Sequence, residues 1–318
     1  MKKLIAESVS NYHPDKICDQ ISDLIVDACL AQDLNSRVAV ETIGGHGLIV
    51  LIGEVTTKAE INFAKIAKKY YQKIINKDIK IISKITKQSP QISQGVNTGG
   101  AGDQGIMIGY ACEENQSKIP QELFLSRLLL VGFSSDAKSQ VVLENNKITS
   151  IVLSVQGKSK QQLKKHVGGL KITNGVTKCY FNNTGAFSIG GFDADSGCTG
   201  RKIVVDAYGP RVPVGGGAFS GKDASKVDRS AAYMARWIAL QLLKKYSAKE
   251  VLVKLGYVIG GDQPLIKQAI IDGKETSFNY DCRPAAIIER LNLKQPIYLQ
   301  TAQKGHFGYI NEYPWEKI

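Results

Sequence analysis

Apolar residues recur along this chain at both helical and strand-like intervals, so the pattern predicts a mixed structure. After a short first strand, the segment His13-Pro14-Asp15-Lys16 begins the first predicted helix. Pro14 suits the first helical position, where its missing N–H costs no hydrogen bond. The apolar residues that follow share one face of this helix, namely Ile17, Ile21, Leu24, Ile25 and Ala28.

The other apolar runs predict strands and helices that do not alternate strictly. Strands are expected at 37–42, 48–56, 106–112, 139–143, 147–155, 202–208 and 251–259, and helices at 58–75, 121–130 and 226–245. The segment 88–105 is rich in Gly, Ser, Gln and Asn and is predicted to be a loop, and 158–165 is a polar connection. Because a regular βαβ order is missing, the pattern favours an α+β fold over a doubly wound sheet.

The length of the chain and the absence of export or membrane signals narrow its class. With 318 residues, of which 43% are hydrophobic, it can form two or three globular subdomains. Its apolar runs are shorter than the roughly 20 residues of a membrane span, and charges near the start interrupt any signal peptide. Six scattered cysteines form no CxxC pair. We therefore expect a cytoplasmic protein with reduced thiols and no membrane association.

A net charge of +12 can indicate either a nucleic acid or a small anionic substrate. Part of the basic excess is expected on solvated helix faces, as for Lys65, Lys68, Lys69 and Lys73. The sequence has no basic stripe interleaved with aromatic residues. We therefore expect a phosphate-rich substrate and no nucleic-acid partner.

The segment 215–223, Gly-Gly-Gly-Ala-Phe-Ser-Gly-Lys-Asp, carries the strongest chemical signal in the chain. Gly216, Gly221 and Lys222 have the GxxxxGK spacing of a phosphate-binding loop, but Asp223 takes the place of the Ser or Thr that binds magnesium in P-loop enzymes. Glycine N–H groups can still surround an anion, and Lys222 adds a positive charge. A helix is expected to begin near Lys226, and its N-terminus also favours an anion. The segment predicts a polyphosphate site outside the P-loop class.

The segment 100–105, Gly-Ala-Gly-Asp-Gln-Gly, matches the dinucleotide-binding fingerprint GxGxxG in sequence but not in its predicted structural context. That fingerprint connects a strand to a helix, whereas this segment follows a loop and precedes a strand-like run at 106–110. We interpret its glycines as allowing a loop backbone to lie close to a planar or sugar ligand.

Four carboxylates stand where either a structural or a chemical role fits. Asp15 and Asp228 lie near predicted helix starts, where they either complement the helix dipole or bind Mg²⁺ together with substrate phosphates. The phosphate-binding character of their neighbours favours the metal. Glu41 and Glu54 lie in apolar strands, where they either face outward or bind a cation or a substrate ammonium group. The residues alone leave that second choice open.

Two further segments pair acidic with basic residues at junctions between loops and strands. One is 136–140, Asp-Ala-Lys-Ser-Gln, and the other is 195–202, which contains Asp195, Arg201 and Lys202. Surface ion pairs of this kind contribute little to stability. Together with the glycine-rich loops, however, they form a set suited to an anionic nucleotide.

The motifs, taken together and in one order, resemble the S-adenosylmethionine synthetases (methionine adenosyltransferases) over almost the whole chain. They are His-Pro-Asp-Lys at 13–16, Gly-Ala-Gly-Asp-Gln-Gly at 100–105, Asp-Ala-Lys-Ser-Gln at 136–140, Thr-Gly-Arg-Lys at 199–202, the segment 215–223, Ser-Lys-Val-Asp-Arg-Ser-Ala-Ala-Tyr at 225–233 and Gly-His-Phe-Gly at 305–308. The resemblance implies an α+β fold of three similar subdomains with pseudo-threefold symmetry and mixed sheets covered by helices. In sequence order the subdomains would span 1–98, 99–190 and 191–318.

The resemblance also implies a reaction and an assembly. The sulfur of L-methionine attacks C5′ of ATP and expels tripolyphosphate, which is then cleaved to pyrophosphate and phosphate. Mg²⁺, with two ions expected, and K⁺ are the implied cofactors, and a homodimer or tetramer has active sites at its dimer interface. Sulfur needs no general base, so cations directed at the multiply charged leaving group should dominate catalysis.

On the matching positions, the resemblance gives each candidate residue a role. His13 would stabilise the departing oxygen, and Asp103 the developing sulfonium charge. The residues along the tripolyphosphate would be Lys138, Arg201, Lys202, Lys222 and Lys226. Methionine would contact Glu54, Gln94 and Asp195, and the ribose would contact Asp136. Asp15 and Asp228 would bind Mg²⁺, and Glu41 would bind K⁺.

The chain departs from the family pattern in its connections. Only Asn97-Thr98-Gly99 lies between 94–96 and Gly100, which is shorter than the family's usual gating loop, and the connection 130–136 is trimmed as well. We also expect this protein to differ from the family pattern after Ile318, where the resemblance implies a further tail. Because such a loop covers the site during turnover, we expect an active but slow enzyme that assembles at least as a dimer.

Two other functions are alternatives to synthesis. A tripolyphosphatase without methionine chemistry would leave Glu54 and Gln94 without a substrate to bind. A nucleotide-binding regulator derived from the enzyme would have lost the phosphate-facing and metal-binding residues, and all of them are present. Synthesis of S-adenosylmethionine from ATP and L-methionine is therefore the function that the sequence predicts.

Overall fold

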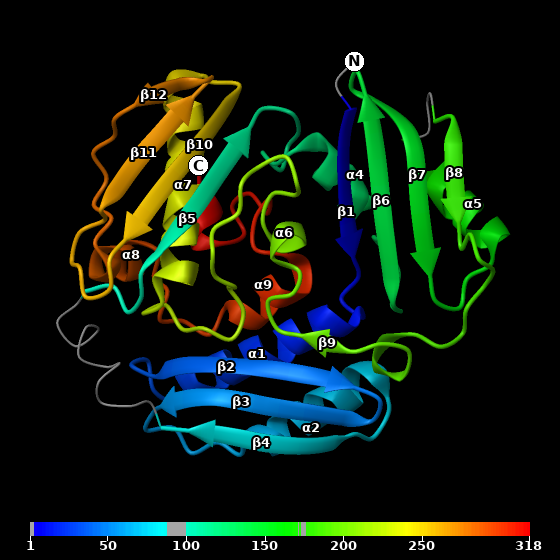
Figure 1. Ribbon diagram of the computed structural model, residues 1–318, viewed down its shortest axis with the longest axis horizontal. Helices are drawn as coiled ribbons and strands as arrows, with labels where there is room; N and C mark the ends of the chain where they lie inside the picture. Colours follow the sequence, from blue (N-terminus) through cyan, green and yellow to red (C-terminus); the bar gives the residue numbers. More distant parts are fainter. Residues whose placement is uncertain (1–2, 88–99, 171, 173–175) are drawn as a thin grey trace.

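Three four-stranded sheets surround a central group of helices in the computed structural model of the chain, which describes residues 3–87, 100–170, 172 and 176–318 (Figure 1). Each sheet packs helices against one of its faces. The predicted α+β fold with three similar parts is therefore confirmed. The subdomain boundaries at 98/99 and 190/191 follow sequence order and stay a prediction.

The first sheet contains β2 (Arg37–Gly45), β3 (Leu48–Thr56), β4 (Lys80–Thr86) and the short β9 (Gly197–Cys198), in the order β4-β3-β2-β9. β2 and β3 form the predicted antiparallel pair, and β4 runs parallel to β3. Helices α1 (Pro14–Leu30) and α2 (Phe63–Ile75) lie on one side of this sheet (Figure 1). Because strand side chains alternate between faces, Val38 and Val40 are buried toward α1 while Glu41 points to the other face.

The second sheet contains β1 (Lys3–Val9), β6 (Ala137–Glu144), β7 (Lys147–Val155) and β8 (Lys178–Phe181), in that order. Helices α4 (Gln121–Leu128) and α5 (Lys160–Gly169) lie on the same face of this sheet (Figure 1). Leu125 of α4, Val141 of β6, Ile151 of β7 and Leu163 of α5 belong to one buried cluster. The hydrophobic core of this sheet is therefore separate from the larger hydrophobic core of the molecule, which includes residues of α1 and α7.

The third sheet contains β5 (Gly105–Cys112), β10 (Glu250–Tyr257), β11 (Ile266–Ile271) and β12 (Lys274–Thr276), in the order β12-β11-β10-β5. The long helix α7 (Val227–Tyr246) packs against β5 and β10. At their crossing, a Cβ on Gly109 would lie 2.0 Å from the backbone carbon of Ala235, so only glycine allows this approach. The other helices among the described residues are α6 (Ile203–Asp206), α8 (Pro284–Arg290) and α9 (Tyr298–Lys304), together with the 3₁₀ turns η1 (Gly191–Asp193) and η2 (Pro314–Glu316).

One predicted strand is wrong, because 202–208 forms a loop and the short helix α6 instead. Its β-branched residues suggested a strand, but their backbone closes a helical turn from Asp206 N–H to the carbonyl of Lys202. The side chains of both Lys202 and Asp206 bind residues of α1. These tertiary contacts fix the turn and override the local preference for a strand.

The polar connection at 158–165 contains a helix that the apolar pattern did not reveal. α5 begins there because Ser159 and Gln162 form a capping box, in which each side chain bonds to the other residue's backbone N–H. The helix predicted at 58–75 begins only at Phe63, after the cap Asn62. Sequence periodicity thus found most elements but placed their ends less well.

His306 is a fully buried histidine in the aromatic core beneath α7. Its Nδ1 lies 2.8 Å from the hydroxyl of Tyr233, and Phe219 packs beside the ring. Burial, reinforced by nearby positive charges, holds the pKa of His306 well below its usual value. The folded protein therefore keeps this ring neutral where an unfolded histidine, with a pKa of about 6.5, takes up a proton.

This difference predicts a pH dependence of stability. Below about pH 6.5 only the unfolded chain binds the proton, so the free energy of unfolding should fall by up to about 1.4 kcal/mol per pH unit from His306. Urea unfolding at pH 7 and pH 5 measures the fall. The variant His306→Gln should lose less stability over this interval, and an equal loss in both proteins would contradict the prediction.

Within the part of the chain that the structure describes, none of the helices is long and apolar enough to cross a membrane. The longest helix, α7, carries basic residues at its C-terminal end and a mixed surface.

Candidate active site

The first half of the candidate site lies where α1 begins. His13 caps the helix, and its Nδ1 accepts the backbone N–H of Asp15 at 3.2 Å. A neutral ring in this arrangement carries its proton on Nε2. Burial, followed by the charge of Lys202, lowers the pKa of His13 to about 4. His13 is therefore neutral at pH 7 and can donate one hydrogen bond to a ligand.

The carboxylate of Asp15 joins the start of α1 to the Thr-Gly-Arg-Lys loop. Its Oδ1 accepts Cys198 N–H at 3.0 Å and Arg201 Nε at 2.8 Å, and its Oδ2 contacts Lys202 Nζ. Burial alone would raise the pKa of Asp15, but the hydrogen bonds from Lys202 and from the Cys198 N–H hold it below its usual value. Two motifs that are far apart in the sequence thus meet at one carboxylate.

The second half of the site is formed by the glycine-rich loop and the first turn of α7. Lys222 Nζ lies 2.6 Å from Oδ2 of Asp228. Gly217 lies directly against that carboxylate, because a Cβ there would be 2.0 Å from its Cγ. The two halves touch, since a Cβ on Gly200 would lie 2.4 Å from Cβ of Ala218.

Asp223, which distinguishes this loop from a P-loop, has a structural role. Its buried carboxylate accepts the N–H groups of Val38 at 2.7 Å and Ser225 at 2.8 Å and contacts Lys226 Nζ. Burial would raise the pKa of Asp223, but Lys226 keeps it below its usual value. The residue fastens the loop to β2 and orients Lys226.

Lys138 and Asp195 lie near His13, and Asp136 lies near Asp195. Asp136 accepts the N–H of Gly191 at 2.9 Å, and burial, with a smaller contribution from Asp195, raises the pKa of Asp136. Lys138 and Asp195 are both close enough to affect the pKa of His13. Lys138 itself pairs with Glu7 at 3.1 Å on the adjacent strand.

Three of the described site residues, Glu41, Glu54 and Asp103, stand apart from this cluster. Glu41 and Glu54 are exposed on the face of the first sheet that points away from α1, as outward-facing strand residues. Asp103 is exposed and accepts the N–H of Gln104 at 2.8 Å. Its loop nevertheless leads to the site, because a Cβ on Gly105 would lie 3.5 Å from Oδ1 of Asp228. Gln94 lies outside the described residues.

Each described cation of the cluster is paired with a carboxylate. Asp15 binds Arg201 and Lys202, Asp228 binds Lys222, and Asp223 binds Lys226. The arrangement therefore presents a dense group of positive charges on two touching loops, without net repulsion between them. Such a group can bind a polyanion whose oxygens replace the carboxylates as partners.

Sequence reasoning missed the buried groups behind these loops. Asp23 accepts Gly221 N–H at 2.8 Å and forms a fully buried ion pair with Arg229, at 2.6 Å. Asp19 accepts Gly200 N–H at 2.8 Å. A signal was present, because Asp15, Asp19 and Asp23 follow one another at intervals of four residues in the first helix.

Comparison with known proteins agrees with this geometry. The N-terminal, central and C-terminal domain models of S-adenosylmethionine synthetase match residues 2–94, 98–187 and 189–317. This chain belongs to the S-adenosylmethionine synthetase family. The prediction of a methionine adenosyltransferase is thereby confirmed at the level of the family.

Two curated relatives share the full length of this family member. The S-adenosylmethionine synthase of Brachyspira hyodysenteriae (strain ATCC 49526 / WA1) is 39% identical over 98% of this chain and 95% of its own. That of Petrotoga mobilis (strain DSM 10674 / SJ95) is 40% identical over 100% of this chain and 97% of its own. The second alignment extends over 391 positions, more than the 318 residues of this synthetase, so the relative carries segments that this chain lacks.

Proposed function

We propose that this synthetase makes S-adenosylmethionine by attack of the methionine sulfur on C5′ of ATP, with release of tripolyphosphate and its cleavage to pyrophosphate and phosphate. The observation that supports this reaction best is the cluster of Arg201, Lys202, Lys222 and Lys226 on two touching loops beside His13. Thioether sulfur attacks without a base, so the barrier lies in the departure of the polyanion, and fixed cations at its oxygens lower it.

His13 would act at the bond that breaks. With Nδ1 held by the N–H of Asp15, its Nε2–H is the free donor of the neutral ring and would bind the departing O5′. A neutral donor stabilises the leaving oxygen without a proton transfer. Lys138 and the four cations of the loops would then hold the tripolyphosphate while it is cleaved, and Asp136 would bind the ribose.

Asp15 and Asp228 fit as ligands of Mg²⁺. Among the described residues, no group of three or more His, Cys, Asp or Glu side chains forms a metal cluster of its own. Mg²⁺ suits such a place, because it binds one or two carboxylates and completes its shell with waters and substrate phosphates. When bound, it would neutralise and orient the polyphosphate. Lys202 and Lys222, which now pair with these carboxylates, would then turn to phosphate oxygens.

Methionine and K⁺ would be bound by carboxylates of the first sheet together with Asp195, Gln94 and Asp103. Glu54, Gln94 and Asp195 would hold methionine, where a carboxylate suits the amino group, and Glu41 would bind K⁺. Asp103 would lie near the sulfur and favour the developing sulfonium charge. Glu41 and Glu54 point outward from the first sheet, so these roles require a second protomer to close the site.

The outward face of the first sheet supports a homodimer. Ile43, Ile52 and Ile82 expose 48%, 51% and 36% of their surface there, around Glu41 and Glu54. An apolar face of this kind marks a protein interface. We propose that two copies pair through it, with active sites at the interface, as a dimer or as part of a tetramer.

This assembly makes a prediction. Ile52→Asp should convert the enzyme to monomers in light scattering and abolish turnover, because a buried charge opposes pairing and the shared site opens. Ile266→Asp, at an exposed isoleucine of β11, is the matched control and should keep both the assembly and the activity. A catalytically competent wild-type monomer would contradict the proposal.

The reaction itself is tested by its products. Purified protein with ATP, methionine, Mg²⁺ and K⁺ should yield sulfonium product, pyrophosphate and phosphate in equal amounts, measured by mass spectrometry and ion chromatography. This outcome would also show that the short connection at 97–99 suffices for turnover. Phosphate without sulfonium product would favour a tripolyphosphatase, and bound ATP without product would favour a nucleotide-binding regulator.

We expect the enzyme in the cytoplasm, where its six free cysteines stay reduced.

A further inference from the structure

Helix α1 carries a row of aspartates at every fourth position, Asp15, Asp19, Asp23 and Asp27. This spacing places them above one another on a single face of the helix. The first three are fully buried. Carboxylates are seldom buried in this way unless each has hydrogen-bond partners. We therefore expect each of these aspartates to bind a specific partner.

The four aspartates accept backbone N–H groups from three other segments of the chain, and Asp15 and Asp19 share one of them. Asp15 accepts Cys198 N–H at 3.0 Å, and Asp19 accepts Gly200 N–H at 2.8 Å. Asp23 accepts Gly221 N–H at 2.8 Å. Asp27 accepts the first two N–H groups of α9, Tyr298 at 2.9 Å and Leu299 at 2.8 Å. The row therefore fastens both cationic loops and one helix to α1.

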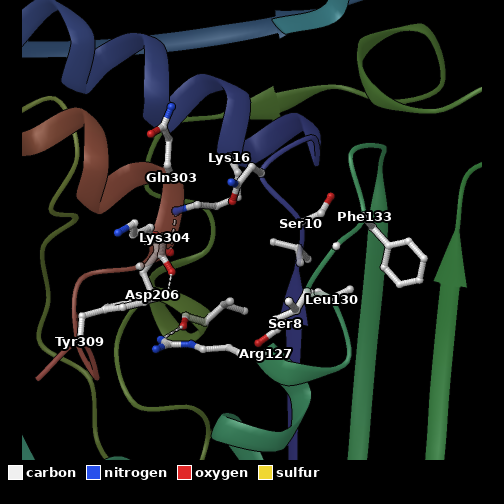
Figure 2. Close-up of a pocket in the computed structure, with 16 residues that line it drawn as sticks. Ser8, Ser10, Lys16, Arg127, Leu130, Phe133, Asp206, Gln303, Lys304 and Tyr309 are labelled. Carbon is white, nitrogen blue, oxygen red and sulfur yellow. Dashed lines mark hydrogen bonds and ion pairs between the residues drawn. The ribbon is translucent and has the colours of Figure 1, made fainter. Parts of the chain in front are cut away.

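Asp19 is held in place by a buried lysine. Lys16 Nζ lies 3.0 Å from Asp19. It also lies 2.6 Å from Asp206, which follows the Thr-Gly-Arg-Lys loop (Figure 2). The pair Lys16–Asp206 lines a cavity of about 250 Å³ that none of the predicted site residues lines. The loop is thus anchored on both sides of Arg201 and Lys202, at Gly200 and at Asp206.

Asp23 fixes the second loop through Arg229. The two side chains form a bidentate pair at 2.6 and 2.8 Å, and Arg229 also donates to the carbonyl of Lys222 at 2.9 Å. Gly221 has φ +82°, and a Cβ there would lie 2.0 Å from the carbonyl oxygen of Val40. The backbone on either side of Lys222 is therefore fixed before any ligand binds.

We propose that Asp19 and Asp23 are positioning residues, which hold the two cationic loops in register so that Arg201, Lys202 and Lys222 face one polyphosphate. The inference rests on the proposed function, in which these cations bind tripolyphosphate. A rise of 1.5 Å per residue places neighbouring aspartates about 6 Å apart along α1, a spacing comparable to the span of a short polyphosphate chain. A rigid helix thereby sets the separation of the loops.

Binding of inorganic tripolyphosphate, measured by calorimetry with excess Mg²⁺, tests the inference on the full-length enzyme. Asp19→Ala should weaken binding by about tenfold, since a hydrogen bond to a charged group is lost. Asp19→Asn keeps an oxygen for Gly200 N–H and should bind within about threefold of the wild type. Should Asp19→Ala fail to fold, Asp19→Ser is too short to reach Gly200 and should show the same loss.

The sign of the effect separates positioning from simple electrostatics. Removing a negative charge near an anion site should by itself tighten anion binding, so tighter binding by Asp19→Ala would overturn the inference, as would equal affinities of the Ala and Asn variants. Asp27→Ala is the matched control, because Asp27 fastens α9 and neither cationic loop. It should lower thermal stability yet bind tripolyphosphate within about twofold of the wild type. An equal loss in Asp27→Ala would show a merely structural role.

Kinetics and the wild-type protein complete the test. Asp19→Ala should lower kcat and leave the KM for methionine unchanged. If part of the variant were simply unfolded, calorimetry would show fewer binding sites per protein, but the affinity of those sites for tripolyphosphate would be unchanged. A wild-type enzyme that fails to bind tripolyphosphate would overturn the proposed assignment of the phosphate site itself.

Discussion

Lys222→Ala is expected to lower kcat by about 10²–10³, because removing one preorganised electrostatic contact to a transition state typically has an effect of this size. The lysine is held at 2.6 Å from Asp228 on a loop whose backbone is fixed on both sides. Because this backbone is fixed, only the end of the side chain has to turn from Asp228 to the phosphate oxygens, and it would do so on binding, before the polyphosphate develops its charge. Steady-state kinetics with saturating methionine and ATP measures the effect.

A matched control for this variant lies at the C-terminal end of α7, whereas Lys222 lies in the loop before that helix. Lys244→Ala removes an exposed lysine from the last turn of α7, far along the helix from Asp228, and should leave kcat unchanged. If Lys222→Ala raised the KM for ATP with kcat unchanged, the contact would act equally in the ground state and the transition state. That result would remove Lys222 from the proposed catalytic groups.

Arg236→Leu is expected to lower the free energy of unfolding by about 3–5 kcal/mol, because it leaves a buried carboxylate unpaired. Arg236 and Glu316 are both fully buried and form two hydrogen bonds of 2.9 Å. Arg236 also donates to the carbonyls of Tyr110 and Lys118, at 2.6 and 2.8 Å. It thereby joins α7, β5 and the C-terminal segment.

Urea unfolding of this variant needs a control pair on the surface. Arg283 and Asp281 are also in contact, at 2.6 Å, but both are exposed, so Arg283→Leu should lower the free energy of unfolding far less than Arg236→Leu. Replacing both buried partners by apolar residues should recover part of the loss, because the unpaired charge is then removed as well. A loss below 1 kcal/mol in Arg236→Leu alone would contradict the prediction.

The sequence predicted the parts of the site that depend on local pattern. The start of α1 at Pro14 follows from helical spacing and a proline in the first turn, and the strand at 106–112 follows from its apolar run. The strand expected at 202–208 failed because Lys202 and Asp206 bind α1 through contacts across more than 180 residues. No local preference contains that information.

The carboxylates show the same division between local and distant information. The outward direction of Glu41 follows from strand alternation, which left its role undecided. The pairing of Asp23 with Arg229 joins residues 206 positions apart, and each residue alone resembles an ordinary charged helix position. Only the assembled fold shows that such charges are buried and that they fix the loops of the site.

The three sheets exchange strands in a closed cycle. β1, from the beginning of the chain, completes the sheet of β6–β8, while β5, from the middle, completes the sheet of β10–β12. β9, from the last third, returns to the sheet of β2–β4. A cut between the first and second thirds of the sequence, or between the second and last thirds, therefore takes one strand away from each of two sheets. None of the three parts keeps its whole sheet when it is separated from the others, so we expect the chain to unfold in one cooperative event despite its threefold plan.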